Sequence, residues 1–403
     1  MRRRTFLGSS ALALGAAALG GSRAAVAAND RIRIGVIGTG ARGQELMRAL
    51  AALPAFEIAA LCDTLPFRLD EGLALAVASK PVAYADHRHL LEDRSLDAVI
   101  VATPFHHHAT AALDAVAAGK HVYCEKTMIR GVADTRRVLE AVRGSGLVFQ
   151  AGFQWHTAPL YEAALALIRG GELGEIAAIH CQWNRNGDWR RPVPDPALER
   201  QINWRMYREY SGGLAAELTA HQVDFANLVV PGGIEYVSGV GDIDYWKDGR
   251  ETYDNIRLTV RYRAGVTATF MSLTTNSLGG YRVSILGRKG AIELTTDKGW
   301  FYPEVPTEAL PDGLDLVSGA SAYADTERTA RAQASDHYAI DAPPADPTAH
   351  ALELFGRSIR EDLQPASNVE TGAVVSVMVQ MALDAMDSAS VVRASPEYAL
   401  PPA

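Results

Sequence analysis

The chain has 403 residues, of which 48% are hydrophobic and 21% are charged, and its formal net charge at pH 7 is −8. This length exceeds what one hydrophobic core usually serves, so two domains are expected. The acidic balance argues against nucleic acid and anionic membranes as partners, and it leaves a small neutral or cationic ligand open. Cys62, Cys124 and Cys181 show no metal-ligand spacing and are expected to be buried apolar residues, although an oxidising compartment would permit one bridge.

The first 27 residues have the pattern of an export signal. Arg3-Arg4-Thr5-Phe6-Leu7 matches the twin-arginine motif, an Ala- and Gly-rich stretch follows, and Ala25-Val26-Ala27 offers the small residues of a cleavage site. The apolar stretch is too short for a membrane anchor, which needs about 20 strongly apolar residues. We therefore predict a periplasmic or secreted protein that is exported folded, with no membrane insertion once residues 1–27 are cleaved.

Residues 31–152 alternate between strand-like and helix-like segments. Helices are expected at 44–52, 109–118 and 133–143, and strands at 31–37, 57–62, 96–102, 121–124 and 147–149. Strands that alternate with helices of this length indicate a parallel, doubly wound sheet. The first predicted domain, 31–152, is therefore of the Rossmann type within an α/β fold.

A glycine motif typical of dinucleotide binding, Gly38-Thr39-Gly40-Ala41-Arg42-Gly43, follows the first predicted strand. Gly38 permits a tight turn, Gly40 lets the backbone approach a pyrophosphate, and Gly43 lets the helix pack close to the strand. The phosphates then lie at the helix N-terminus, where free N–H groups and the helix dipole favour negative charge.

The choice between the two nicotinamide cofactors depends on the end of the second strand. Asp63 stands there, 20 residues after Gly43, where its carboxylate can accept both ribose hydroxyls of NAD. The same charge would repel the 2′-phosphate of NADP. NAD is therefore the expected cofactor, and NADP remains the alternative because the neighbouring Arg68 offers a partner for a phosphate.

After Gly152 the pattern changes to runs of strands. A helix is expected at 159–168, followed by strands at 176–183, 234–245, 255–262, 266–273, 281–286 and 291–295. Such runs indicate a largely antiparallel sheet, so 153–403 is predicted to be a substrate-binding α+β domain that closes with helices at 349–360 and 371–388. The Pro-, Ala- and Asp-rich segment 302–347 is expected to be a surface excursion or a subunit arm. The expected assembly is a homo-oligomer.

Further motifs accompany the glycine motif. They are Thr103-Pro104 with His108, Gly119-Lys120-His121-Val122 leading into Glu125-Lys126, and Gly212-Gly213 leading into Glu217 and His221. With them the chain resembles the Gfo/Idh/MocA (glucose–fructose oxidoreductase and inositol dehydrogenase) family over nearly all of its length after residue 27. The resemblance, together with the glycine motif, implies a cofactor site made by Gly38, Thr39, Gly40, Arg42, Gly43, Asp63, Thr103, Pro104, His108 and Glu125.

The resemblance also implies the catalytic residues. Glu125 would contact the nicotinamide ribose, Lys126 would hydrogen-bond the reacting hydroxyl, and Glu217 and His221 match the acid-x-x-x-His pair in which His accepts the proton. Oxidation of a secondary alcohol requires removal of its proton as hydride leaves, a task that suits His. A cationic Lys stabilises the developing alkoxide. Because residues four apart on a helix share a face, Glu217 can orient His221 or contact the substrate itself.

The chain departs from the family pattern at three positions. Thr127 replaces the Pro that commonly follows the Lys, which leaves the cis peptide bond of the family open. Glu217 stands where Asp is more usual, and Phe105 stands where Asn often follows Thr-Pro. These changes bear on the substrate more than on the cofactor.

Candidate substrate residues follow the sixth predicted strand and lie in two aromatic segments. By family likeness Gln154 and His156 line the cleft, with plain packing as the alternative. Segments 184–191 and 204–208 mix aromatic rings with Arg and Asn, which suits stacking on a sugar face, although subunit interfaces favour the same residues. The predicted substrate residues of these segments are Trp189, Arg190 and Trp204.

A metal site is not expected. Three successive residues, His106, His107 and His108, cannot all face one ion, and His108 is better placed as a helix-start residue near the cofactor.

The sequence thus predicts an exported oxidoreductase that acts on a secondary hydroxyl of a sugar, glycoside or polyol. Because export separates it from the cytosolic cofactor pool, its NAD is expected to be tightly held and recycled in place. One alternative is a redox-neutral glycoside hydrolase on the same fold. The other is a sugar-binding protein with a relic cofactor site, which the presence of Lys126 and His221 argues against.

Overall fold

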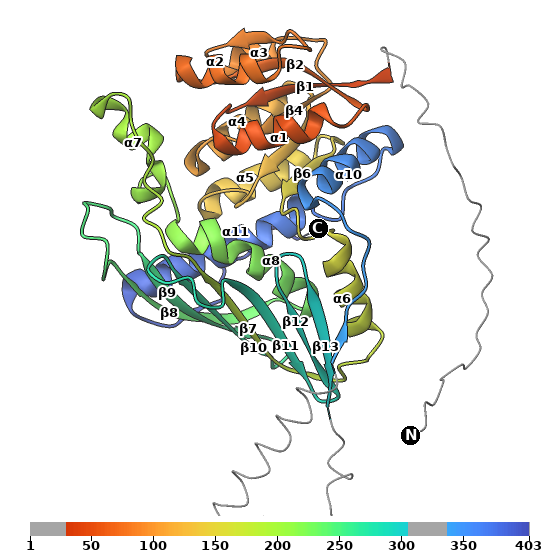
Figure 1. Cartoon of the computed structure of the whole chain (residues 1–403), viewed down its shortest axis with the longest axis vertical. Coiled ribbons are helices and arrows are strands. Elements are labelled where there is room, and N and C mark those ends of the chain that lie inside the picture. The colour runs from red at the N-terminus through yellow and green to blue at the C-terminus, as the bar shows by residue number, and fades with distance from the viewer. Residues whose placement is uncertain (1–29, 305–336, 403) are drawn as a thin grey trace, which may run out of the picture.

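The structure, a computed structural model, describes residues 30–304 and 337–402. Two sheets are separated by a layer of helices (Figure 1). The first sheet has six strands in the described part of the chain, in the order β3-β2-β1-β4-β5-β6, and all its pairings are parallel. Its elements are β1 (Ile32–Ile37), α1 (Ala41–Ala51), β2 (Phe56–Cys62), α2 (Pro66–Leu75), β3 (Val82–Tyr84), α3 (His87–Leu91), β4 (Ala98–Val101), a 3₁₀ turn (Phe105–His107), α4 (His108–Ala117), β5 (His121–Glu125), α5 (Val132–Arg143) and β6 (Phe149–Gly152).

This strand order confirms the predicted Rossmann-type sheet. All four residues of β4 are buried, because a parallel sheet is covered by helices on both faces and its strands become continuously apolar. The direction of winding reverses between β1 and β4. In doubly wound sheets this switch point, at the carboxyl ends of the strands, is where ligands bind.

Among the described residues, the second sheet has nine strands in the order β14-β13-β12-β11-β7-β10-β9-β8-β15. It is antiparallel except for the β7–β10 pair, which confirms the largely antiparallel prediction. Its elements are α6 (Pro159–Arg169), β7 (Ile176–Asn184), α7 (Glu199–Ile202), a π turn (Ala215–Thr219), α8 (Ala220–Val229), β8 (Ile234–Asp242), β9 (Asn255–Tyr262), β10 (Thr267–Leu273), β11 (Tyr281–Gly287), β12 (Gly290–Leu294), β13 (Gly299–Pro303), β14 (Tyr338–Ala339), α10 (Pro347–Glu361), α11 (Val369–Ser388) and β15 (Val392–Arg393).

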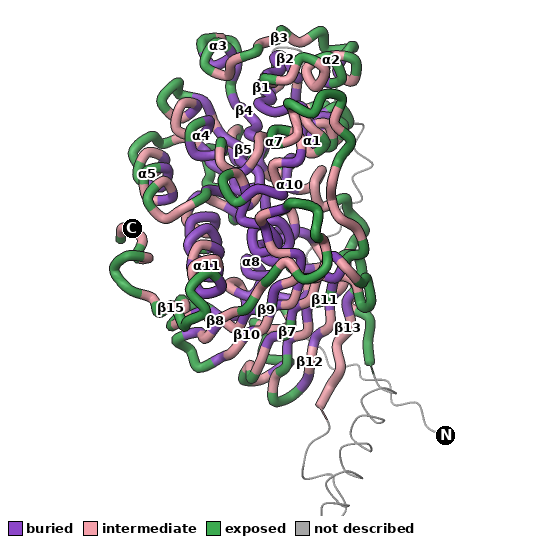
Figure 2. Tube along the Cα trace, turned by 90° about the vertical axis from the view of Figure 1, so that its left-hand side faces the viewer, coloured by how far each residue is buried: buried purple, intermediate pink, exposed green. Residues whose placement is uncertain are grey.

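One face of this sheet packs against α8 and α11. In β9 the alternate residues Ile256, Leu258, Val260 and Tyr262 are buried, as expected for a strand with one face on a core. Figure 2 shows the buried residues of both sheets meeting the helices between them. The catalytic candidates Glu217 and His221 lie in this helical layer, on the side that faces the first sheet.

The C-terminal helices belong to both domains. In α10, Phe355 makes an edge-to-face contact with Tyr123 of β5, with ring centroids 5.8 Å apart, and its neighbours join the apolar core of the first sheet. The boundary expected at residue 153 therefore does not separate α10 from the first domain. Helix α11 contacts α5 and β6 on one side and α8 and β8 on the other. It is long and apolar enough to cross a membrane, but 67% of its apolar window is buried inside the protein, as in a core helix.

One predicted segment lies outside the described residues, and another is described only in part. The export signal at 1–27 lies outside the described residues. Of the segment 302–347, residues 305–336 also lie outside them, but its two flanks are anchored: Trp300 and Phe301 of β13 pair with Ala339 and Tyr338 of β14 at the edge of the second sheet.

Candidate active site

The loop between β1 and α1 is shaped to receive a dinucleotide. Gly38 has a φ of +98°, and a Cβ there would lie 2.6 Å from the carbonyl oxygen of Ala102. A Cβ on Gly43 would overlap the carbonyl oxygen of Gly38, so the helix starts close against the strand. At Gly40 nothing lies within 4 Å of the position that a Cβ would occupy, so this side of the loop is open to a ligand.

Asp63 holds the same loop. Its Oδ2 accepts hydrogen bonds from the backbone N–H of Thr39, at 2.9 Å, and from the Thr39 hydroxyl, at 3.2 Å. The neighbouring cation Arg68 forms an ion pair with Glu71, with Nη1 and Oε2 2.8 Å apart. A 2′-phosphate at this place would meet the carboxylate of Asp63 while Arg68 is already paired, which agrees with NAD as the cofactor.

Polar atoms without partners line the route from this loop toward β5 and β6. Arg42 Nε donates to Glu125 at 2.8 Å, while Arg42 Nη2, the Thr103 hydroxyl and Gln154 Oε1 are buried with no hydrogen-bond partner in the described structure. Buried polar groups are normally satisfied, so unpaired ones point to a bound molecule. With the open side of Gly40, this set fits the dinucleotide implied by the motif.

His108 connects two loops of the cofactor edge. It starts α4, its Nε2 lies 3.0 Å from the carbonyl oxygen of Thr103, and its Nδ1 lies 3.1 Å from the carbonyl oxygens of Thr127 and Met128. It is therefore a buried residue that supports the cofactor loops, at the helix start where it was predicted.

No group of three or more metal-binding side chains occurs among the described residues.

Lys126 joins the two domains. Its Nζ donates to the backbone carbonyl of Glu217 at 3.1 Å and lies 3.7 Å from the Glu217 carboxylate. Arg205 Nε donates to the same carboxylate at 2.7 Å. The peptide bond between Lys126 and Thr127 is cis, although Thr replaces the family's Pro.

Glu217 does not orient His221 by a hydrogen bond. Burial would raise the pKa of Glu217, but the charges of Lys126 and Arg205 hold it below its ordinary value. The ionised carboxylate therefore bonds to two cations instead of a neutral imidazole, because charge-assisted contacts are the stronger ones. The expectation that Glu217 aims His221 is corrected: Glu217 positions Lys126.

His221 is set up to accept a proton. Burial, followed by the charges of Lys126 and Arg42, lowers the pKa of His221 well below its ordinary value, so the ring is neutral at pH 7. Its Nδ1 is buried without a hydrogen-bond partner in the described structure. The ring lies against Trp155 and Trp183, with centroids 4.7 and 5.8 Å away.

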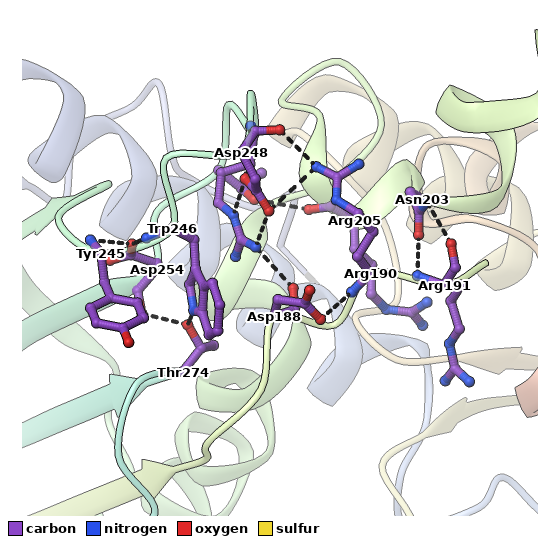
Figure 3. Close-up of polar contacts among 12 residues, drawn as sticks. Asp188, Arg190, Arg191, Asn203, Arg205, Tyr245, Trp246, Asp248, Asp254 and Thr274 are labelled. Atoms are coloured by element: carbon purple, nitrogen blue, oxygen red, sulfur yellow. Dashed lines mark hydrogen bonds and ion pairs between the residues drawn. The ribbon is translucent and has the colours of Figure 1, made fainter. Parts of the chain in front are cut away.

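The predicted substrate residues have different surroundings. His156 is buried, and its Nδ1 lies 3.0 Å from both carboxylate oxygens of Asp224, so it fixes the loop after β6 instead of contacting substrate. Arg190 forms ion pairs with Glu199 and with Asp248, and the Asp248 contact, at 3.4 Å, is drawn in Figure 3. Two carboxylates thus neutralise its charge in the described structure, and its role toward a substrate stays a prediction.

The remaining candidates stay near the cleft. Trp204 lies beneath Arg205, whose guanidinium carbon is 4.2 Å from the ring centroid, and Arg205 in turn contacts Glu217. Trp189 has an unpartnered indole N–H and a φ of +64°, which is unusual for a bulky residue. Gln154 keeps a free amide oxygen.

The sequence analysis did not name two aromatic residues of this site, and it did not pair Arg205 of segment 204–208 with Glu217. Trp155 and Trp183 form its aromatic wall, and Arg205 completes the charge cluster at Glu217. Trp183 shares its strand face with the buried Ile179 and Cys181, so alternation along β7 would have placed it on the inner side. No sequence spacing indicates the pairing of Arg205 with Glu217.

The fold and this site define an oxidoreductase with a nicotinamide cofactor. Residues 32–153 match the model described as the oxidoreductase family with an NAD-binding Rossmann fold, and residues 161–293 match the Gfo/Idh/MocA C-terminal domain. Together the two matches cover more than half of the chain. The chain belongs to the Gfo/Idh/MocA family, and its first domain binds NAD.

Curated relatives and solved structures agree with this placement. A levoglucosan dehydrogenase of Pseudarthrobacter phenanthrenivorans is 28% identical over 50% of this chain and 52% of its own length. A glycosyl hydrolase family 109 protein of Stenotrophomonas maltophilia is 33% identical over 47% of this chain and 43% of its own length. The chain thus aligns with only about half of each.

Among solved structures, levoglucosan dehydrogenase in complex with NADH and levoglucosan superposes with a TM-score of 0.70, at 19% identity, over 90% of this chain and 99% of that one. The aldose–aldose oxidoreductase of Caulobacter crescentus, complexed with glycerol, gives a TM-score of 0.71 at 18% identity, over 90% of this chain and 100% of that one. At these identities the likeness establishes the fold.

The glycine loop offers a matched pair of substitutions. Gly43→Ala introduces a methyl group into the Gly38 carbonyl, so it should lower the unfolding free energy by about 1–3 kcal/mol as well as weaken NAD binding. Gly40→Ala meets open space in the protein and should weaken NAD binding with little change in the melting temperature of the cofactor-free protein. Thermal melts with and without NAD separate the two effects. Equal melting temperatures for both cofactor-free variants would contradict the assignment.

The environment of His221 predicts a particular pH dependence. A base acts only when neutral, and the pKa of His221 lies well below 6.5, so kcat/KM should stay level through pH 6.5 and fall only at lower pH. Lys126→Met should lower the rate by roughly two to four orders of magnitude. It should also move the acid limb to higher pH, because a cation that holds the pKa down is removed.

The matched control is Lys126→Arg, which keeps the charge and should leave the acid limb near its original pH even if the rate falls. Near-normal turnover in Lys126→Met, or an unmoved acid limb, would show that the site lies elsewhere.

Proposed function

We propose that this protein is an exported, NAD-dependent oxidoreductase that oxidises a secondary hydroxyl of a sugar, glycoside or polyol. The observation that carries the proposal is the convergence of Lys126 from the first domain and His221 from the second, next to the open glycine loop. The names of the relatives, levoglucosan dehydrogenase among them, support the substrate class.

The chemistry divides between the cofactor and the protein. Bound NAD supplies the acceptor for the hydride that leaves the carbinol carbon. Lys126 Nζ donates a hydrogen bond to the hydroxyl oxygen and stabilises the negative charge that develops on it. The neutral imidazole of His221 accepts the hydroxyl proton at a ring nitrogen, and Trp155 and Trp183 keep water away from the reacting atoms.

Export and cofactor recycling belong to the same proposal. The twin-arginine motif at Arg3-Arg4 supports export in the folded state, which lets the cofactor load before translocation. Outside the cytosol, turnover requires that a second substrate reoxidise the bound cofactor. The fold shared with an aldose–aldose oxidoreductase supports a sugar in that role.

A redox-neutral glycoside hydrolase is the second candidate, favoured by the 33% identity to a glycosyl hydrolase family 109 protein. In that reaction a ring carbon is oxidised, the glycosidic bond breaks by elimination, and the hydride returns to the sugar. Lys126 supports the dehydrogenase, because it can hold an alkoxide without any leaving group.

The products distinguish the two reactions. A dehydrogenase should convert a methyl glucoside, in the presence of an artificial electron acceptor, to a keto-glycoside that is two mass units lighter, with the glycosidic bond intact. A hydrolase should release methanol without any acceptor and should incorporate deuterium in heavy water beside the transient ketone. Mass spectrometry of the product measures both the loss of two mass units and the incorporation of deuterium. If methanol is released without an acceptor and the product carries deuterium, the protein is the hydrolase and the dehydrogenase proposal is wrong.

Location and cofactor retention can be measured together. The purified protein should keep NAD through extensive dialysis, seen as absorbance near 340 nm after a reducing sugar is added. Replacing Arg3 and Arg4 by Lys should confine the protein to the cytosol, with Arg23→Lys as the matched control in the same segment. Loss of all dinucleotide on dialysis, or export of the Arg3 and Arg4 variant, would contradict this part of the proposal.

A further inference from the structure

The segment between β7 and the π turn is rich in arginine. Residues 185–208 hold six of them. Four are neutralised by carboxylates, and the pairs are Arg190 with Glu199 and Asp248, Arg200 with Glu209 and Glu251, Arg205 with Glu217, and Arg208 with Asp387. In the described part of the chain, Arg185 and Arg191 have no carboxylate within ion-pair distance of their guanidinium groups.

Both unpaired arginines are exposed, and each has one contact that fixes its position in the segment. The guanidinium carbon of Arg185 lies 5.4 Å from the centroid of the Trp189 ring. The backbone of Arg191 is clamped by Asn203, whose Oδ1 accepts from the Arg191 N–H at 2.7 Å and whose Nδ2 donates to the Arg191 carbonyl at 3.0 Å. In Figure 3 the Arg191 side chain extends away from this clamp without a partner among the residues drawn.

Arg185 stands two residues after Trp183 of β7, whose ring centroid lies 5.8 Å from that of His221, so the arginine-rich segment begins beside the catalytic residues. Partial desolvation, followed by the positive charges of Arg191 and Arg205, lowers the pKa of Arg185. Arg205 in turn shares the Glu217 carboxylate with Lys126, at 2.7 and 3.7 Å. Arg185 and Arg191 therefore belong to the same segment as Arg205, which contacts the Glu217 carboxylate beside Lys126.

The unpaired charges of this segment are positive. Lys126 and Arg205 share the carboxylate of Glu217, whereas Arg185 and Arg191 have none within ion-pair distance in the described structure, in a chain whose net charge is −8. Like charges gathered in a cleft repel one another and attract anions. Guanidinium groups bind carboxylate and phosphate through paired N–H donors, and Trp189 beside Arg185 offers an aromatic face to a sugar ring.

We propose that the substrate is an anionic sugar, one that carries a carboxylate or a phosphate, and that Arg185 and Arg191 bind its charged group while its hydroxyl lies at Lys126. This inference rests on the proposed function, whose reaction it leaves unchanged. The proposed anionic ligand differs from the neutral or cationic ligand that the acidic composition left open. The reason is that the unpaired arginines are positive, whereas the net charge of the whole chain is negative.

The test compares sugars that differ only in charge. Glucose, glucuronate and glucose 6-phosphate are added to the purified NAD-loaded protein, reduction of the bound cofactor is followed at 340 nm, and binding is measured separately by calorimetry. At least one anionic sugar should bind about tenfold more tightly than glucose, and its Kd should rise between about 50 and 500 mM salt, because screening weakens charge contacts. If glucuronate binds more tightly and in a salt-dependent way, the charged group of the substrate is a carboxylate. If glucose 6-phosphate does so, the charged group is a phosphate.

The variants assign the effect to the two arginines. In the Arg185→Gln, Arg191→Gln double variant, the preference for the anionic sugar over glucose should fall about 10- to 100-fold, the range for loss of charge-assisted hydrogen bonds. The control is Arg288→Gln, in the β11–β12 turn at the other end of β7, which should keep the preference. Melting temperatures establish that all variants are folded.

Two results would overturn the inference: glucose binding as tightly as both anions to the unaltered protein, or an anion preference that survives in the double variant. If anionic sugars bind in an arginine-dependent way but no sugar reduces the cofactor, the proposed oxidation fails while the anion site stands. If glucose reduces the cofactor and neither anion binds better, the oxidation stands and the anion site fails.

Discussion

The contact between Lys126 and Glu217 is the interaction on which the active site depends. Lys126 follows β5 of the first domain, and Glu217 lies in the π turn that precedes α8 of the second, so this contact brings the cofactor edge and the proton acceptor together. It also fixes the protonation states. Glu217 stays ionised between two cations, and burial together with the charge of Lys126 lowers the pKa of His221 and keeps its ring neutral. One ion pair thus positions the donor to the alkoxide and sets the base next to it.

The C-terminal helices make this arrangement rigid. Helix α10 packs on the first sheet through Phe355, and α11 lies between α5 and α8. Arg143 of α5 also forms a two-point ion pair with Glu370 of α11, at 2.6 and 2.7 Å. Because the two domains share these helices, Lys126 and His221 are held at one place without relying on a flexible linker.

The unpaired charges near the active site are positive, whereas the net charge of the whole chain is negative. Net charge describes the average field, which governs solubility and nonspecific partners, whereas a ligand responds to the few charges within reach. Exposed arginines without a carboxylate partner stay available to an anionic ligand. The acidic composition argues against large anionic partners, whereas the proposed small ligand would respond to the local charge of Arg185 and Arg191.

The sequence by itself indicated the first domain and NAD as its cofactor, and with the family resemblance it named Lys126 and His221 as the catalytic candidates. These follow from local chemistry: the glycine loop needs small residues at fixed spacing, Asp63 ends a strand that its own apolar run defines, and Lys126 follows directly from β5. The cis bond after Lys126 was open in the sequence, since Thr127 does not by itself favour it.

Only the tertiary structure decided how the charges pair. In the structure His156 pairs with Asp224 and Arg190 with Glu199, while Arg185 has no carboxylate within ion-pair distance among the described residues. Partners such as Lys126 and Glu217 are 91 residues apart. Sequence spacing carries no signal for such contacts, because they depend on how two domains and a long loop pack in space.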